Sequence, residues 1–184
     1  MTDNKIICLV GASGSGKTTI AEAVQRGDEI KVLPSYTTRP MRSPDETGHI
    51  FVDNFDEIRD ELAAYTVFNG YEYGATHEQV DAHQIYVIDP SGVEYMQKTR
   101  PPGSFVVVWI TASENARFKR MEATRGREKA KERIEHDREI YDNIVGADYL
   151  LVNETDDDLG QCIIEMHELC KELFGRKEGE QSNA

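Results

Sequence analysis

The sequence is poor in cysteine, tryptophan and long apolar runs. It holds three cysteines and one tryptophan in 184 residues. Cys8, Cys162 and Cys170 follow no metal-binding spacing and are odd in number, so we expect no disulfide framework and a buried free thiol at Cys8. No apolar stretch approaches the about 18 residues that cross a bilayer, and the N-terminus lacks a signal-peptide pattern. We therefore expect a cytoplasmic protein with no membrane partner.

Basic residues are also scarce relative to acidic ones. The chain has 34 acidic and 21 basic residues and a formal net charge of −13, which excludes non-specific nucleic-acid binding as a function. Nine of the 21 bases fall within residues 117–138. Such a concentration in an acidic protein predicts phosphate contacts, or else a solvated helix face on which bases alternate with glutamates.

The most informative stretch is rich in glycine and lies near the N-terminus. Residues 11–18 read Gly-Ala-Ser-Gly-Ser-Gly-Lys-Thr, between an apolar run and a segment of helical composition. Its glycines allow backbone angles that point main-chain N–H groups at phosphate oxygens. Lys17 supplies positive charge to the terminal phosphates, and the Thr18 hydroxyl is a ligand for Mg²⁺. The stretch predicts a phosphate-binding loop (P-loop) for a nucleoside triphosphate.

The apolar pattern predicts an α/β fold with a central parallel sheet. Near-continuous apolar runs at 5–10, 85–89, 105–110 and 149–152 alternate with helical segments, which is typical of parallel strands covered on both faces. A short strand is also expected at 30–33. The expected helices lie at 17–26, at 113–142 with a break near 124–126, and at 156–174.

Residues 34–80 interrupt this alternation and predict a small α+β insertion. Residues 34–48 form a turn-rich loop with three prolines and two arginines, Arg39 and Arg42, and a loop of this length is usually functional. Asn69-Gly70 predicts a hairpin turn. We expect strands at 50–52, 65–68 and 71–73, and helices at 53–64 and 76–82.

Asp89 ends one of the apolar runs. A carboxylate at the carboxyl end of a parallel strand faces the crevice where ligands bind, and in P-loop enzymes it holds Mg²⁺. The alternative is a turn residue before Pro90. Thr18 and Asp89 are therefore the candidate metal ligands.

Three stretches together resemble the guanylate kinases, which are nucleoside-monophosphate kinases of the P-loop superfamily. They are the P-loop with Thr19, the segment Ser-Tyr-Thr-Thr-Arg-Pro-Met-Arg at 35–42, and the turn Asn-Gly-Tyr-Glu-Tyr-Gly at 69–74. The resemblance implies a single kinase domain with a central parallel sheet, helices on both faces and a helical lid. The implied parts are a core at 1–33, 81–122 and 139–174, an acceptor-binding insertion at 34–80, and a lid at 123–138. The polar composition of residues 175–184 predicts a disordered tail.

The resemblance also implies a reaction and a division of labour. ATP with Mg²⁺ would phosphorylate a nucleoside monophosphate of the GMP or dGMP type to the diphosphate. The residues implied are Gly11, Ala12, Ser13, Gly14, Ser15, Gly16, Lys17, Thr18, Thr19 and Asn153 for ATP; Lys17, Arg120, Arg125 and Arg133 for catalysis, with Arg127 and Arg138 as alternatives; and Ser35, Arg39, Arg42, Phe51, Glu72 and Tyr73 for the acceptor.

The chain departs from the family where guanine is recognised. Two family carboxylates align with Ala64 and Val87, and apolar side chains cannot accept the guanine N–H groups. Glu72 is a candidate substitute, and His49 replaces a usual tyrosine. A kinase of another (deoxy)nucleoside monophosphate, or of a small phosphate ester such as a ribose phosphate, is therefore an open alternative. A non-catalytic guanylate-kinase-like binding module is a third, which the intact P-loop disfavours.

Overall fold

The first sheet is parallel, as its apolar strands predict. The computed structural model describes residues 5–27, 30–141 and 146–175. The strands β1 (Ile6–Val10), β6 (Ile85–Val87), β7 (Phe105–Thr111) and β8 (Tyr149–Val152) lie in the order β6-β1-β7-β8, and all pairs are parallel. The strand predicted at 30–33 is wrong, because only Val32 forms an isolated bridge, to Ile85.

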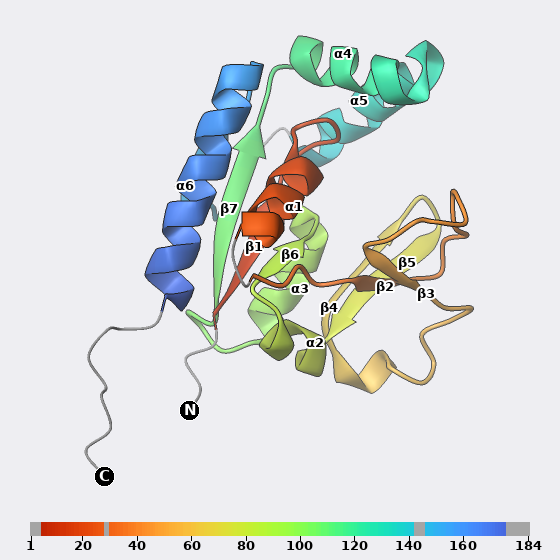
Figure 1. The fold of residues 1–184 in the computed structure, drawn as a ribbon. Coiled ribbons are helices and arrows are strands. Elements are labelled where there is room, and N and C mark those ends of the chain that lie inside the picture. Colours follow the sequence, from red (N-terminus) through yellow and green to blue (C-terminus); the bar gives the residue numbers. More distant parts are fainter. Residues whose placement is uncertain (1–4, 28–29, 142–145, 176–184) are drawn as a thin grey trace, which may run out of the picture.

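Helices cover both faces of this sheet. On one face α1 (Lys17–Gly27) and α6 (Asp156–Phe174) pack together over Ile7 and Leu9, and on the other α3 (Pro90–Thr99) packs near Ile6 and Cys8. Figure 1 shows α3 between the first sheet and the rest of the β structure. The predicted buried thiol of Cys8 is confirmed, and burial raises its pKa to about 12.

A second sheet contains the strands of residues 35–76. The strands β2 (Ser35–Thr37), β3 (His49–Phe51), β4 (Leu62–Phe68) and β5 (Tyr71–Thr76) lie in the order β3-β2-β5-β4. The predicted β4–β5 hairpin is confirmed, with φ of 51° at Asn69 and 77° at Gly70. The predicted helix that follows is α2 (His77–Ala82), which Thr76 caps.

The helix predicted at 53–64 is wrong. Residues 53–58 form bends and turns, the short 3₁₀ helix η1 (Arg59–Glu61) follows, and Leu62 already pairs with Thr76 as the start of β4. Phe55 is fully buried and contacts the rings of Tyr36 and Tyr65. The apolar residues Phe55 and Leu62 have helical spacing, but Phe55 is buried in a turn and Leu62 is buried at the start of a strand.

A pair of helices lies between β7 and β8 in the sequence. The helices α4 (Glu114–Arg125) and α5 (Arg127–Tyr141) are separated at Gly126, whose φ is 83°, so the predicted break is confirmed. Figure 1 shows this pair above the P-loop, across from the second sheet. The expected tail lies outside the described residues after Gly175. Within the described residues, none of the helices is long and apolar enough to cross a membrane.

Candidate active site

The P-loop connects β1 to α1, and two of its glycines have no room for a side chain. A Cβ on Gly11, at φ 155°, would collide with the Ile110 carbonyl oxygen of β7. One on Gly16, at φ 103°, would collide with the amide nitrogen of Asn153. The loop is therefore held tightly against the carboxyl ends of neighbouring strands, which leaves Lys17 and Thr18 at the start of α1.

Lys17 is folded back onto the loop. Its Nζ donates to the carbonyl oxygens of Gly11, at 2.5 Å, and Ala12, at 3.1 Å. Burial, assisted by the positive charges of Arg133, Arg117 and Arg125 and opposed by the charge of Asp137, lowers the Lys17 pKa to about 8. A phosphate group bound beside Lys17 would stabilise its charged form.

One pocket joins the P-loop to the second sheet and the helix pair. Its volume is about 210 Å³. It is lined by Ser13 and Lys17 of the P-loop; Ser35, Arg39, Arg42, His49, Thr66, Phe68 and Tyr73 of the second sheet and its loop; Tyr86, Val87, Ile88 and Asp89; and Arg133, Asp137 and Tyr141 of α5. The structure therefore brings together predicted donor-side and acceptor-side residues that are distant in the sequence.

Glu46 holds the two arginines on the second-sheet side. Its carboxylate accepts from Arg39 Nη1 at 3.0 Å and Nη2 at 2.7 Å, and from the Arg42 main-chain N–H at 2.6 Å. The hydrogen bonds from Arg39 hold the Glu46 pKa at about 2. The guanidinium of Arg39 also lies over the Phe51 ring at 5.3 Å, which places Phe51 behind Arg39 and outside the pocket lining.

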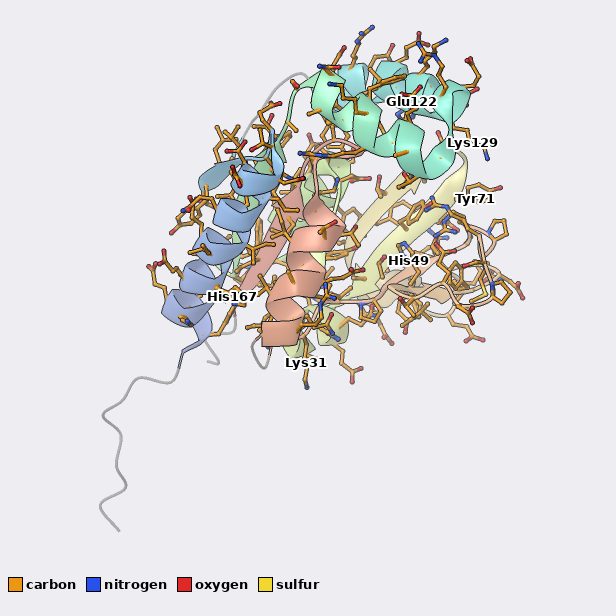
Figure 2. All side chains as sticks on the ribbon, turned by 45° about the horizontal axis from the view of Figure 1, so that its top comes forward. Lys31, His49, Tyr71, Glu122, Lys129 and His167 are labelled. Atoms are coloured by element: carbon orange, nitrogen blue, oxygen red, sulfur yellow. The ribbon has the colours of Figure 1, made fainter. Side chains whose placement is uncertain are left out.

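His49 lies beside Ser35 at the second-sheet side of the pocket (Figure 2). Its Nδ1 is 2.9 Å from the Ser35 hydroxyl, and its ring contacts that of Tyr73 edge-on. Burial, and then the charge of Arg39, lower the His49 pKa. The imidazole is therefore neutral near pH 7 and offers hydrogen bonds without a net charge.

Glu72 is not brought to the pocket. It accepts from Arg59 Nη2 and from the Tyr65 hydroxyl, each at 2.8 Å. Adjacent strand residues point to opposite faces, so Tyr73 in the pocket places Glu72 on the back of the sheet. Ala64 is fully buried in the core, and Val87 lines the pocket with an apolar side chain.

Asn153 and Arg120 brace the P-loop from outside the pocket. The Asn153 amide donates to the Ser15 carbonyl oxygen at 2.7 Å. Arg120 donates to the carbonyl oxygens of Asn153, at 2.9 Å, and Gly14, at 3.3 Å. Both side chains are thus engaged with main-chain groups of the loop and of the segment after β8.

The other two predicted lid arginines lie along the pocket entrance. Arg125 and Arg133, together with Arg42 and Lys129, line a groove that continues from the pocket. Figure 2 labels Lys129 and Tyr71 where α5 lies over the β4–β5 hairpin. Burial, and then the charges of Arg42 and Arg133, lower the Arg125 pKa. The alternatives Arg127 and Arg138 pair instead with Glu122 and Glu114.

The candidate metal ligands fit a cation that binds mainly to phosphates. Asp89 lines the pocket and caps α3 through the Gly92 N–H at 2.7 Å, and burial raises its pKa. Thr18 is exposed beside Lys17. In the described ranges no group of three or more His, Cys, Asp or Glu side chains is placed to hold a metal. One or two oxygen ligands plus substrate phosphates is the usual setting for Mg²⁺.

Sequence reasoning missed several pocket residues, of which Asp137 is the most consequential. Its carboxylate accepts the Ser13 N–H at 2.6 Å and lies 3.4 Å from Arg117 Nη1. Its place on the core-facing side of α5, three residues after the buried Ile134, was the available signal. Thr66, Phe68, Tyr86 and Tyr141 are non-charged and carry no motif, so only the fold brings them to the pocket.

Comparison with known proteins identifies solved structures with the same fold. A guanylate kinase from Anaplasma phagocytophilum has the same fold, with a TM-score of 0.62 and 20% identity over 92% of this chain and 85% of that one. An uncharacterized protein from Eubacterium ventriosum (TM-score 0.48, 13% identity, covering 90% of this chain and 99% of that one) and a sugar kinase from Janibacter sp. (0.45, 14%, 92% and 94%) are more distant. A search of curated proteins finds no match.

The predicted resemblance to guanylate kinases is thus confirmed at the level of the fold, including the parallel sheet and its covering helices. A family of P-loop proteins, described as AAA domain, matches residues 7–142, about three quarters of the sequence. The match begins in β1 and includes the whole P-loop. On this match the chain belongs to the AAA domain family.

Proposed function

We propose that this protein is an ATP-dependent kinase whose acceptor already carries a phosphate group. The observation that carries the proposal is the shared pocket, which has Ser13 and Lys17 on one side and Arg39 and Arg42 on the other. Two phosphate-binding groups facing one pocket is the arrangement that an in-line transfer between two phosphates requires.

The chain's own residues supply positioning and charge. The P-loop N–H groups and Lys17 bind the donor phosphates, Arg39, Arg42 and Tyr73 hold the acceptor phosphate, and Arg133 and Arg125 neutralise charge from the helix pair, which acts as a lid. Thr18 and Asp89 would hold Mg²⁺, which when bound neutralises charge on the phosphate oxygens. A phosphate is already a competent nucleophile, so no protein base is needed. Closure of the lid excludes water and suppresses ATP hydrolysis.

The first candidate acceptor is a nucleoside monophosphate of the GMP or dGMP type. The second is a phosphorylated compound without a guanine base. The second candidate is favoured by the position of Glu72, which is bonded to Arg59 and Tyr65 behind the sheet. Among the pocket residues, the carboxylates are Asp89 and Asp137. Another (deoxy)nucleoside monophosphate or a small phosphate ester such as a ribose phosphate therefore fits the pocket chemistry as well as guanine does.

ADP release measured with Mg-ATP and a panel of acceptors tests the proposal. The panel holds GMP, dGMP, AMP, dAMP, CMP, UMP, dTMP and ribose phosphates. We expect one acceptor class to stimulate release well above the rate with ATP alone. Arg39→Gln should reduce kcat/KM for that acceptor by about 100-fold or more, because it removes a positive charge and N–H donors from the acceptor side of the pocket.

Arg59→Gln is the matched control, because it removes an arginine–carboxylate pair from the back of the same sheet. It should leave kcat/KM within about twofold, as expected for an exposed ion pair. Stimulation by no acceptor, with nucleotide still bound, would contradict the kinase proposal and favour a binding module.

A further inference from the structure

Asp137 brings a carboxylate from α5 onto the main chain of the P-loop. Its Oδ2 accepts the Ser13 N–H at 2.6 Å, and its side chain is 1% exposed. Arg117 of α4 donates to the same carboxylate oxygen and to the Ser13 carbonyl oxygen, both at 3.4 Å. The helix pair therefore holds both main-chain polar groups of Ser13.

The position that Asp137 occupies favours an anion in general. Lys17 and Arg133 line the same pocket, and P-loop N–H groups are donors for phosphate oxygens. An N–H has a single hydrogen, so a carboxylate oxygen and a phosphate oxygen compete for it. Two anions held side by side would also repel each other.

We propose that Asp137 is an internal substitute for a nucleotide phosphate, so that nucleotide binding must displace this carboxylate and move α5. The inference rests on the proposed function only in assuming that a nucleoside triphosphate binds the P-loop. Its consequence is an autoinhibitory contact, in which the empty protein holds its helix pair on the loop through its own acid.

Arg133 provides a second observation. It lies one helical turn before Asp137 and lines the same pocket, but its Nε is buried without a hydrogen-bond partner among the described residues. Its guanidinium lies over the Phe68 ring at 4.7 Å. The helix α5 thus carries an aspartate that is bonded to the P-loop and an arginine whose Nε–H group has no acceptor among the described residues. Displacement of the acid by a phosphate would leave that base facing the newly bound anion.

The contact should reduce the apparent nucleotide affinity. When only a fraction of the protein has a free Ser13 N–H, the apparent Kd rises by the reciprocal of that fraction. Removing the charge should release the contact, because a charge-assisted hydrogen bond is about twice as strong as a neutral one. Variants at Asp137 should therefore bind nucleotide more tightly than the unaltered protein.

Calorimetric titration with adenylyl imidodiphosphate and Mg²⁺ tests this directly. Asp137→Asn keeps the size of the side chain, and Asp137→Ala removes it. Each should bind the analogue at least about fivefold more tightly than the unaltered protein, because the competing charge is gone. Glu139→Gln, which removes one exposed negative charge from the same helix, should bind as the unaltered protein does.

The unaltered protein offers a second measurement that needs no variant to fold. Trp109, the single tryptophan, lies 6.0 Å from the ring of Tyr141, one turn beyond Asp137 on α5. Displacement of α5 should change Trp109 fluorescence on titration with the analogue, with the midpoint found by calorimetry. The Asp137→Ala variant without nucleotide should already show part of this change in Trp109 fluorescence.

Unchanged or weaker binding by both Asp137 variants would overturn the inference, as would unchanged Trp109 fluorescence in a saturated protein. Weaker binding by Asp137→Asn would make Asp137 a part of the nucleotide site. Absence of binding by every protein, variants included, would instead overturn the proposed function and the inference with it. Tighter binding by the variants supports the inference even if no acceptor is ever phosphorylated.

Discussion

Lys17 is the residue whose chemistry depends most on its surroundings. The residue is half-buried, and its ammonium group donates to two P-loop carbonyl oxygens. Burial and three nearby arginines lower its pKa to about 8, against the opposing charge of Asp137. A bound phosphate would restore the charged form, because an adjacent anion stabilises the ammonium.

Nucleotide binding should therefore take up protons at alkaline pH. Near pH 8.5 an empty-site Lys17 with a pKa of about 8 is mostly neutral, while the nucleotide-bound form is protonated. The affinity should fall as pH rises above about 8, with about three quarters of a proton taken up per nucleotide at pH 8.5. Calorimetry at pH 8.5 in buffers of different ionisation enthalpy measures this number.

Lys17→Met should abolish the proton uptake and weaken binding strongly. Lys31→Met, an exposed lysine far from the P-loop in Figure 2, is the matched control and should change neither. Equal proton uptake by Lys17→Met and the unaltered protein would assign the titration to another group.

At the scale of elements, the loop between β2 and β3 depends on one carboxylate. Glu46 accepts hydrogen bonds from the Arg39 guanidinium and from the Arg42 main chain, and it is 15% exposed. The pair keeps Arg39 buried at the pocket and closes the turn-rich stretch on itself. Loop shape and arginine position are thus set by the same contact.

Glu46→Gln should destabilise the protein in a pH-dependent way. The Glu46 pKa is held at about 2 in the folded protein, below its ordinary value of 4.5, by the hydrogen bonds from Arg39. A depressed pKa contributes stability that is present above about 4.5 and is lost as pH falls toward 2. Glu46→Gln should cost about 1–2 kcal/mol of unfolding free energy at pH 7 and little at pH 2.

Urea denaturation of both proteins at pH 7 and at low pH measures this difference. Glu57→Gln, an exposed glutamate of the 53–58 turn, is the matched control and should cost less than about 0.5 kcal/mol at either pH. If Glu46→Gln lowers the unfolding free energy by the same amount at both pH values, the ionised Glu46–Arg39 pair does not contribute to stability.

Local sequence patterns predict individual structural elements well. They do not predict which side chains from different elements contact each other. The P-loop, the β4–β5 hairpin, the break at Gly126 and the bounds of α6 follow from local sequence, and the structure confirms them. The helix at 53–64 failed because the helical spacing that includes Phe55 and Leu62 served a turn and a strand. Glu72, the candidate substitute for the missing guanine-binding carboxylates, lies on the opposite face of β5 from its neighbour Tyr73.

The contacts that the sequence does not predict depend on the tertiary structure. Asp137 and Arg117 reach Ser13 only because α4 and α5 lie over the P-loop, more than 100 residues away in the sequence. Glu46 is four residues from Arg42, but the bidentate pair with Arg39 depends on how the loop turns. Periodicity can place Asp137 on the buried face of α5, but it does not identify the partners of such contacts.

At the scale of the whole molecule, an acidic chain places six of its 21 bases around one cleft. The net charge is −13, yet Lys17, Arg39, Arg42 and Arg133 line one pocket, and Arg125 and Lys129 line the groove beside it. This distribution attracts small polyanions to the cleft. The P-loop, the second sheet and the helix pair each contribute to it, which is what a two-substrate phosphotransferase requires.

The most direct measurement follows the phosphate itself. ATP labelled with ³²P at the γ position is mixed with Mg²⁺ and each phosphate-bearing acceptor, and the products are separated. We predict label in the acceptor, with an inorganic phosphate yield that is small by comparison, and loss of both in Lys17→Met. Label found only in inorganic phosphate, or retained in ATP with every acceptor, would contradict the assignment as a kinase of phosphorylated acceptors.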